Sequence, residues 1–423
     1  MARVSHHDID LILRPEVGEL EAVDALTIAG DDGPLFLHLN SRLVLTSIEQ
    51  VGRQLAASFD SESDGVRRYR IEDWAAGSAP VTVRWSGRLD RFEGYKVTII
   101  SPDCIELSGF GNWFPTVERQ SQLEQFTYDL RIQLPSGWQV VTPGFSAHRD
   151  TLRMVHSRQT PIEDILICAA PAWQRAEVRS GPSLLTVLAR GFSDQDMARL
   201  ADDFRAAVAV VAGHFGPMSA DCGGTFVVTP RGPEAADWGY ERGDIWVVGD
   251  EFVRALLAND WCLPWAPGPQ SLALHETIHA WFGQALRFSQ PWLVEALTQY
   301  LQVVLTEEMF ARPGLSDGYF EWYRSRIAAK PEQVSRPASA MAITDSMYTC
   351  WYLKGSWAFW DIEAAVGRGR LLAAIAACYG KHVGTTIDAA TFCRELESAL
   401  GLPLREHFAH WFDAPGFAPR CRA

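Results

Sequence analysis

The segment 271–300, SLALHETIHAWFGQALRFSQPWLVEALTQY, is the stretch from which the rest of the chain can be interpreted. It contains two histidines four residues apart, His275 and His279, and Glu276 lies directly after the first of them. Residues i and i+4 of a helix lie on one face, so both imidazoles would point to one place, as a metal ion requires. Glu276 would point away from the metal and hold a water molecule on it. The alternative interpretation is a helix with two structural or surface histidines.

A third ligand is needed, because catalytic zinc usually has three protein ligands and leaves its fourth position to water. Pro291 suits the first residue of a second helix, and Glu295 follows it in the apolar segment WLVEAL. A carboxylate in apolar surroundings is unfavourable unless it is paired or binds a metal. We therefore predict that Glu295 completes a site for one zinc ion per chain. In the alternative interpretation, Glu295 points to solvent from a polar face that it shares with Gln299 and Gln302.

Outside this segment the chain changes from a β-rich to a helical pattern. Residues 1–175 contain short β-rich runs such as DIDLIL, VTVRW and YDLRIQL, separated by turn formers such as DDGP and PSGW. The segment 193–215, SDQDMARLADDFRAAVAVVAGHF, has a serine cap and apolar residues at helical spacing. From about residue 250 the pattern is almost entirely helical. We therefore predict an α+β fold, with an antiparallel β domain at 1–175, sandwich-like or saddle-like, and a mainly α domain at 176–423.

Composition excludes some classes of partner. The net charge is −14, and lysine and arginine are scattered, which argues against binding to nucleic acid. No run is long and apolar enough for a membrane span, and the first residues lack the apolar core of a signal peptide. The 8 cysteines include no CxxC pair, so we interpret them as reduced thiols and expect a cytoplasmic protein.

The metal-site segment also carries a resemblance to a known family. HETIHAWFGQ (275–284) followed by WLVEALTQY (292–300) resembles the zinc site of the alanyl aminopeptidase family of gluzincins, which carries HExxHxWxGN and then WLNEGFAxY. These zinc metallopeptidases include leukotriene hydrolase/aminopeptidase-like enzymes. Three further stretches resemble the family in the same order, namely 6–30 with its opening strands, 111–144 with its WFP stretch, and 348–359 with its Y.KG segment. The resemblance therefore extends over nearly the whole chain.

The resemblance implies a fold and a set of roles. The fold would be a β-saddle domain followed by a thermolysin-like catalytic domain, without the large C-terminal helical domain that covers the cleft in many relatives. The spacing between the second histidine and the third ligand is shorter than the family usually has, so the connecting loop must be shorter. The resemblance assigns the zinc ligands to His275, His279 and Glu295, and the general base to Glu276.

Two tyrosines gain possible roles from the same comparison. Tyr352, in the segment YLKG, matches the tyrosine with which the family stabilises the oxyanion. Tyr348 is a further candidate for contact with the substrate. The alternative interpretation of Tyr352 is a core tyrosine packed beside Trp351 and Trp357.

The groups that would bind the free amine of a substrate are matched less well. Glu106 lies where the family has a Glu or Gln that grips this amine, and its alternative interpretation is an exposed loop carboxylate. The family's GAMEN strand is represented by PEAADWGYERGDIWVV (233–248), in which the glutamate position falls on Ala236. Asp237 or Glu234 would have to replace that glutamate, and either is alternatively a surface charge.

These residues predict a zinc hydrolase that cleaves peptide bonds, most simply an aminopeptidase for small peptides or peptide-like metabolites. The poor match to the amine-binding strand keeps open an amidase or endopeptidase that needs no free amine. A third interpretation is a non-catalytic, zinc-bound scaffold. The presence of Glu276 argues against the scaffold, because a scaffold needs no general base.

Overall fold

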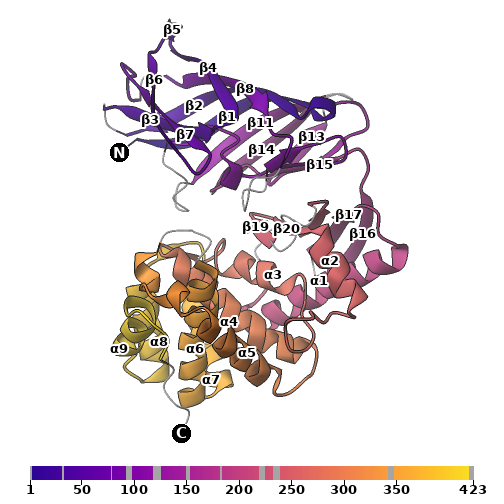
Figure 1. Ribbon diagram of the computed structural model, residues 1–423, viewed down its shortest axis with the longest axis vertical. Helices are drawn as coiled ribbons and strands as arrows, with labels where there is room; N and C mark the ends of the chain where they lie inside the picture. Colours follow the sequence, from indigo (N-terminus) through magenta and orange to yellow (C-terminus); the bar gives the residue numbers. More distant parts are fainter. Residues whose placement is uncertain are drawn as a thin grey trace. The chain divides into compact units, whose positions relative to one another are not determined.

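The chain is described from a computed structural model, which covers residues 2–30, 33–77, 79–91, 98–117, 125–148, 153–181, 183–218, 224–231, 239–341 and 347–418 (Figure 1). It forms two compact units. The first consists of Met1–Arg175, Leu188–Phe192 and Val227–Phe252, and the second of Ala176–Val187, Ser193–Phe226 and Val253–Ala423. The β-rich N-terminal part and the mainly helical C-terminal part confirm the predicted α+β class.

An eight-stranded sheet forms the core of the first unit. Its order is β13-β14-β11-β1-β2-β8-β4-β5, and β1 pairs parallel with β11 while the other pairs described in it are antiparallel. Along β1, Ile9, Leu11 and Leu13 are buried, whereas Asp10 and Arg14 are exposed, as in a strand with one face on the core. The strands are β1 (Arg3–Arg14), β2 (Glu19–Ala29), β4 (Leu43–Gln50), β5 (Arg53–Gln54), β8 (Val81–Arg88), β11 (Phe126–Gln133), β13 (Phe145–His148) and β14 (Arg153–Ile162).

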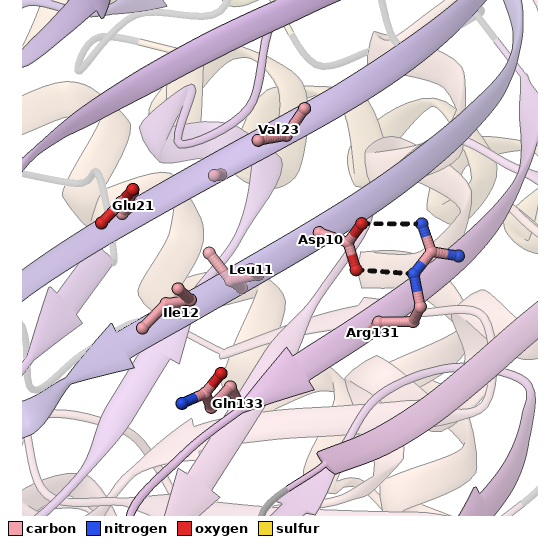
Figure 2. A pocket seen from close by; sticks show the side chains of 8 residues that line it. Asp10, Leu11, Ile12, Glu21, Val23, Arg131 and Gln133 are labelled. Carbon is pink, nitrogen blue, oxygen red and sulfur yellow. Dashed lines mark hydrogen bonds and ion pairs between the residues drawn. The ribbon is translucent and has the colours of Figure 1, made fainter.

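The polar face of this sheet carries ion pairs. A hollow of about 80 Å³ lies on that face. Figure 2 shows Glu21 and Gln133 in its lining. Arg131 on β11 donates to both carboxylate oxygens of Asp10 on β1, at 2.6 and 3.2 Å. An exposed pair of this kind contributes little to stability, so the hollow fits a solvated sheet face.

Smaller sheets complete the β structure. A four-stranded sheet has the order β12-β15-β10-β9, a three-stranded sheet β3-β7-β6, and a five-stranded sheet β16-β17-β18-β20-β19. Their strands are β9 (Thr98–Ile100), β10 (Ile105–Leu107), β12 (Gln139–Val141), β15 (Ile167–Ala170), β3 (Leu35–Asn40), β6 (Ala57–Ser63), β7 (Val66–Ile71), β16 (Gln174–Ser180), β17 (Ser183–Ala189), β18 (Thr225–Thr229), β19 (Gly239–Arg242) and β20 (Ile245–Gly249). Every residue of β10 and β15 is buried, so these strands lie inside the unit.

Helices build most of the second unit, which also contains the short parallel pair β21 (Arg287–Phe288) and β22 (Thr386–Ile387). The predicted start of the helix at Ser193 is confirmed, because Ser193 caps α1 and forms a capping box with Asp196. Within the described ranges, no helix has the length and apolar composition that a membrane crossing requires. The helices are α1 (Asp194–Phe215), α2 (Asp250–Ala258), α3 (Leu274–Trp281), α4 (Pro291–Met309), α5 (Leu315–Ala329), the π-helix η6 (Tyr348–Lys354), α6 (Gly355–Val366), α7 (Arg368–His382), α8 (Ala389–Leu400), α9 (Arg405–Phe408) and a second π-helical turn, η7 (Ala409–Asp413).

Candidate metal centre

Two consecutive helices bring the predicted ligands together. His275 and His279 lie one turn apart on α3, whose apolar residues Leu274 and Ile278 are fully buried and hold the helix in the unit. Glu295 lies on α4, which begins with Pro291 at its first position, as the sequence predicts. Among the described residues, these two imidazoles and this carboxylate offer ligand atoms that all lie within 4.8 Å of one another.

The distances between the ligand atoms match those around a tetrahedral zinc ion. The Nε2 atoms of His275 and His279 are 3.2 Å apart, and Glu295 Oε2 lies 3.6 and 3.5 Å from them. Ligand atoms that are each about 2.0–2.1 Å from zinc, at tetrahedral angles, lie roughly 3.3–3.4 Å from one another. All three side chains are 13–17% exposed, so water can still reach the site. The donor set therefore fits zinc with one open position.

The electrostatics of the site also call for a cation. Glu295 Oε2 is buried and makes no hydrogen bond of good geometry with the described residues. Burial alone would raise the pKa of Glu295. The neighbouring His279 and His275 imidazoles lower it by more, so the pKa of this carboxyl is well below its usual range. The oxygen is therefore anionic at neutral pH. A buried carboxylate oxygen of this kind is costly unless a metal or a charged partner binds it.

The second ring nitrogen of each histidine is held by a residue of α4. His275 Nδ1 lies 3.0 Å from Gln302 Oε1, and His279 Nδ1 lies 3.4 Å from Thr298 Oγ1. Because Gln302 Oε1 can only accept, His275 carries its proton on Nδ1 and leaves Nε2 free for a metal. Gln299 Nε2 donates to the same Gln302 oxygen at 3.0 Å. The polar face of α4 thus points into the site, and the alternative interpretation of Glu295 as a solvent-facing residue is wrong.

Thr298 and Gln302 were not predicted as part of the site, although the sequence contains a signal for them. They lie three and seven residues after Glu295, and Gln299 lies four residues after it. Positions i, i+3, i+4 and i+7 form one face of a helix. A polar stripe at this spacing in an otherwise apolar helix follows the third ligand and marks the residues that orient the histidines.

Tyr352 is located beside the first histidine. Its ring stacks on the His275 ring with centroids 5.7 Å apart and an interplanar angle of 15°. The Tyr348 ring lies next to it, with centroids 5.1 Å apart, and Tyr348 is 46% exposed. Burial raises the pKa of Tyr352 well above its usual value, and the negative charges of Glu295 and Glu276 add to this effect. The phenol is therefore protonated at neutral pH and available as a hydrogen-bond donor.

An unusual backbone carries this tyrosine. Tyr348–Lys354 forms a π-helix that continues into α6, and π-helical turns are rare and frequently occur at functional sites. The following residue, Gly355, packs against α4, where an added Cβ would lie 2.6 Å from the Cβ of Ala296. Ala296 directly follows Glu295, so this close packing sets how near Tyr352 comes to the ligand set.

Three predicted residues remain, namely the proposed general base Glu276 and the proposed amine-binding residues Glu106 and Asp237. Glu276 is buried in the first turn of α3, at 7% exposure. Glu106 belongs to the first unit, on β10, where Arg231 donates to its two oxygens at 2.7 and 3.1 Å and the Tyr240 hydroxyl also donates to it. Glu106 is completely buried, so its interpretation as an exposed loop carboxylate is wrong, while its role in binding an amine stays a prediction. Asp237 lies outside the described residues.

No protein-family model matches the chain, and no curated protein matches it. Solved structures do match it. A variant of the M1 zinc metallopeptidase from Deinococcus radiodurans, bound to a Tyr-Ser-Ala substrate, is 15% identical with a TM-score of 0.70, and the match covers 99% of this chain and 95% of that one. Yeast LTA4 hydrolase in complex with bestatin is 17% identical with a TM-score of 0.73, covering 99% and 69% of the two chains. Legionella pneumophila aminopeptidase A in complex with aspartic acid is 14% identical with a TM-score of 0.71, covering 98% and 50%. The chain therefore has the fold of the M1 zinc metallopeptidases.

Proposed function

We propose that this chain is a zinc-dependent hydrolase that cleaves peptide bonds, and specifically an aminopeptidase that removes N-terminal residues from small peptides or peptide-like metabolites. The observation that carries the proposal is the convergence of His275 Nε2, His279 Nε2 and the unsatisfied Glu295 Oε2 at 3.2–3.6 Å from one another. That geometry fits a catalytic zinc ion with a position left open.

Each residue around this position has a part in the reaction. A bound zinc ion supplies Lewis-acid chemistry, which lowers the pKa of water to about 7 and polarises a carbonyl. The Glu276 carboxylate takes the proton of the attacking water and passes it to the leaving amine. The Tyr352 hydroxyl donates a hydrogen bond to the carbonyl oxygen as it gains negative charge, and one such donor is worth about 3 kcal/mol in the transition state.

Peptide substrates are supported by the structural neighbours. The Deinococcus radiodurans metallopeptidase was solved with a Tyr-Ser-Ala substrate, and the yeast enzyme with bestatin. The exposed ring of Tyr348, next to Tyr352, offers an apolar contact for a substrate side chain beside the reacting group.

The requirement for a free substrate amine distinguishes the aminopeptidase from a second candidate function. An aminopeptidase needs a carboxylate for the substrate ammonium, and Glu106 and Asp237 are the proposed groups. Glu106 already has a buried guanidinium partner in Arg231, and breaking such a pair is strongly unfavourable. This contact favours, as a second candidate, an amidase or endopeptidase that accepts blocked peptides.

The experiment that tests the proposal compares matched peptides with free and acetylated N-termini. The protein should contain about one zinc per chain by elemental analysis, and it should hydrolyse the free peptides much faster than the blocked ones. Equal rates on both would select the second candidate. Absence of zinc binding at micromolar zinc would refute both candidates.

A further inference from the structure

Asp203 is a buried carboxyl group far in sequence from the metal ligands. It lies on α1 and is 7% exposed, among the buried residues Leu200, Phe204 and Ala207 of the same helix face. Aspartate is rarely buried unless its oxygens are used. Its position on the apolar face therefore calls for a specific partner.

That partner is the beginning of α3, the helix that carries both histidines. Asp203 Oδ2 accepts a hydrogen bond from Ser271 Oγ at 2.9 Å and from the backbone N–H of Ala273 at 3.3 Å. Ser271 Oγ in turn accepts from the backbone N–H of Leu274 at 3.1 Å. The residue at the N-cap position, Ala273, has no side chain that could cap the helix. Asp203 and Ser271 together replace the missing cap.

α1, the helix that carries Asp203, also holds the other end of α3. The indole of Trp281, the last residue of α3, donates to the carbonyl oxygen of Gly216, which follows the end of α1, at 3.1 Å. Phe215 and Phe282 pack edge to face next to this contact, with centroids 4.9 Å apart. α1 thus fixes α3 at its first and its last turn.

Fixing both ends matters because α3 is short. It has 8 residues, and a helix of this length has little stability of its own in water and depends on its caps and its packing. His275 directly follows Leu274, whose N–H is part of the cap. A change at the first turn therefore alters the direction of His275 relative to His279.

We infer that Asp203 is a positioning residue for the metal centre, which holds the first turn of α3 so that His275 and His279 converge on one zinc ion. The inference rests on the proposed function, because it assumes that the site binds zinc. Burial raises the pKa of Asp203, and the hydrogen bonds from Ser271 and Ala273 offset only part of this effect, so that the pKa is about 7. The hydrogen-bond acceptor, which both protonation states retain, is therefore the property that positions the helix.

The test measures zinc affinity of the full chain by competition with a chelator, well below the unfolding temperature. Asp203→Ala should raise the zinc dissociation constant about 10- to 100-fold, the usual effect of removing a group that orients a metal ligand. Asp203→Asn should restore most of the affinity, because its amide oxygen still accepts. The matched control is Asp202→Ala, since Asp202 is exposed and pairs with Arg205 on the surface of the same helix; its zinc affinity should equal that of the wild type.

Two results would overturn the inference. One is a folded Asp203→Ala protein, as judged by circular dichroism, whose zinc affinity is unchanged. The other is equal affinity in Asp203→Ala and Asp203→Asn. If Asp203→Ala does not fold, Ser271→Ala removes the same cap at lower cost, and an unchanged affinity there has the same meaning. A wild-type chain that binds no zinc would instead refute the proposed function, so the two failures can be distinguished.

Discussion

Gly355 lies where the π-helix that carries Tyr352 passes into α6, and a side chain there would collide with the metal-binding helix. A Cβ at Gly355 would lie 2.6 Å from the Cβ of Ala296, whereas apolar carbon atoms pack at about 4 Å. Gly355→Ala therefore forces the two helices apart by about 1 Å. Glu295 precedes Ala296 on one side of the contact, and Tyr352 lies three residues before Gly355 on the other, so the displacement acts on the distance between them.

The expected loss follows from this geometry. A misplacement of about 1 Å in a catalytic group costs about 100-fold in rate, which corresponds to about 2.7 kcal/mol in the activation free energy. Overpacking of the contact should also lower the free energy of unfolding by about 1–3 kcal/mol. Zinc content should not change, because all three ligands are still present. The assay is kcat for a peptide substrate, with zinc content and urea unfolding measured on the same preparation.

Two further variants make the interpretation specific. Gly369→Ala is the control, because Gly369 is also in a helix but an added Cβ there meets no atom within 4 Å; kcat should equal that of the wild type. Combining Gly355→Ala with Ala296→Gly restores the space and should recover most of kcat. The free energy of unfolding should stay about 1 kcal/mol lower, because glycine is unfavourable in a helix. A kcat for Gly355→Ala within twofold of the wild type, or no recovery in the double variant, would refute the reasoning.

The remaining predictions address the chemistry directly. Glu276→Gln should keep zinc but lower kcat by about 10³-fold or more, as expected for loss of the general base; retained hydrolysis would remove that role. Tyr352→Phe should lower kcat by about 100-fold with little change in KM, whereas an unchanged kcat would leave Tyr352 as a packing residue. Gln302→Leu should weaken zinc binding about 10- to 100-fold in chelator competition, because His275 loses its acceptor, and equal affinity would contradict that role. Because the pKa of Asp203 rises from 3.8 to about 7 on folding, its contribution to the free energy of unfolding should fall by about 4 kcal/mol in total as the pH rises from below 3.8 to above 7. Asp203→Asn should abolish this part of the decline, and urea titrations in which the variant and the wild type decline in parallel would contradict it.

Some of these features follow from local sequence alone. The i, i+4 spacing places His275 and His279 on one face, Pro291 marks the start of the next helix, and Ser193 caps α1, because each signal depends on residues within one turn of each other. Other features depend on partners that are distant in the chain. Asp203 is 68 residues from Ser271 and Arg231 is 125 residues from Glu106, and no periodicity predicts such a contact. π-Helical turns are rare, and no periodicity in the sequence predicts the one before Gly355.

α4 has features of both kinds, some predictable from local sequence and some dependent on distant parts of the chain. Its polar residues at 295, 298, 299 and 302 share one face, and periodicity alone does not decide whether that face meets water or a site. The rest of the helix decides it, because Trp292 and Leu293 begin a run that is buried on the other faces too, and a helix that is apolar on its remaining surface is enclosed by protein. Polar side chains on the enclosed part of such a helix have little water to face, so most of their polar atoms bind one another or an ion. Thr298, Gln299 and Gln302 have partners around the two imidazoles, and the oxygen that this network leaves over is Glu295 Oε2, the atom that the zinc ion would bind.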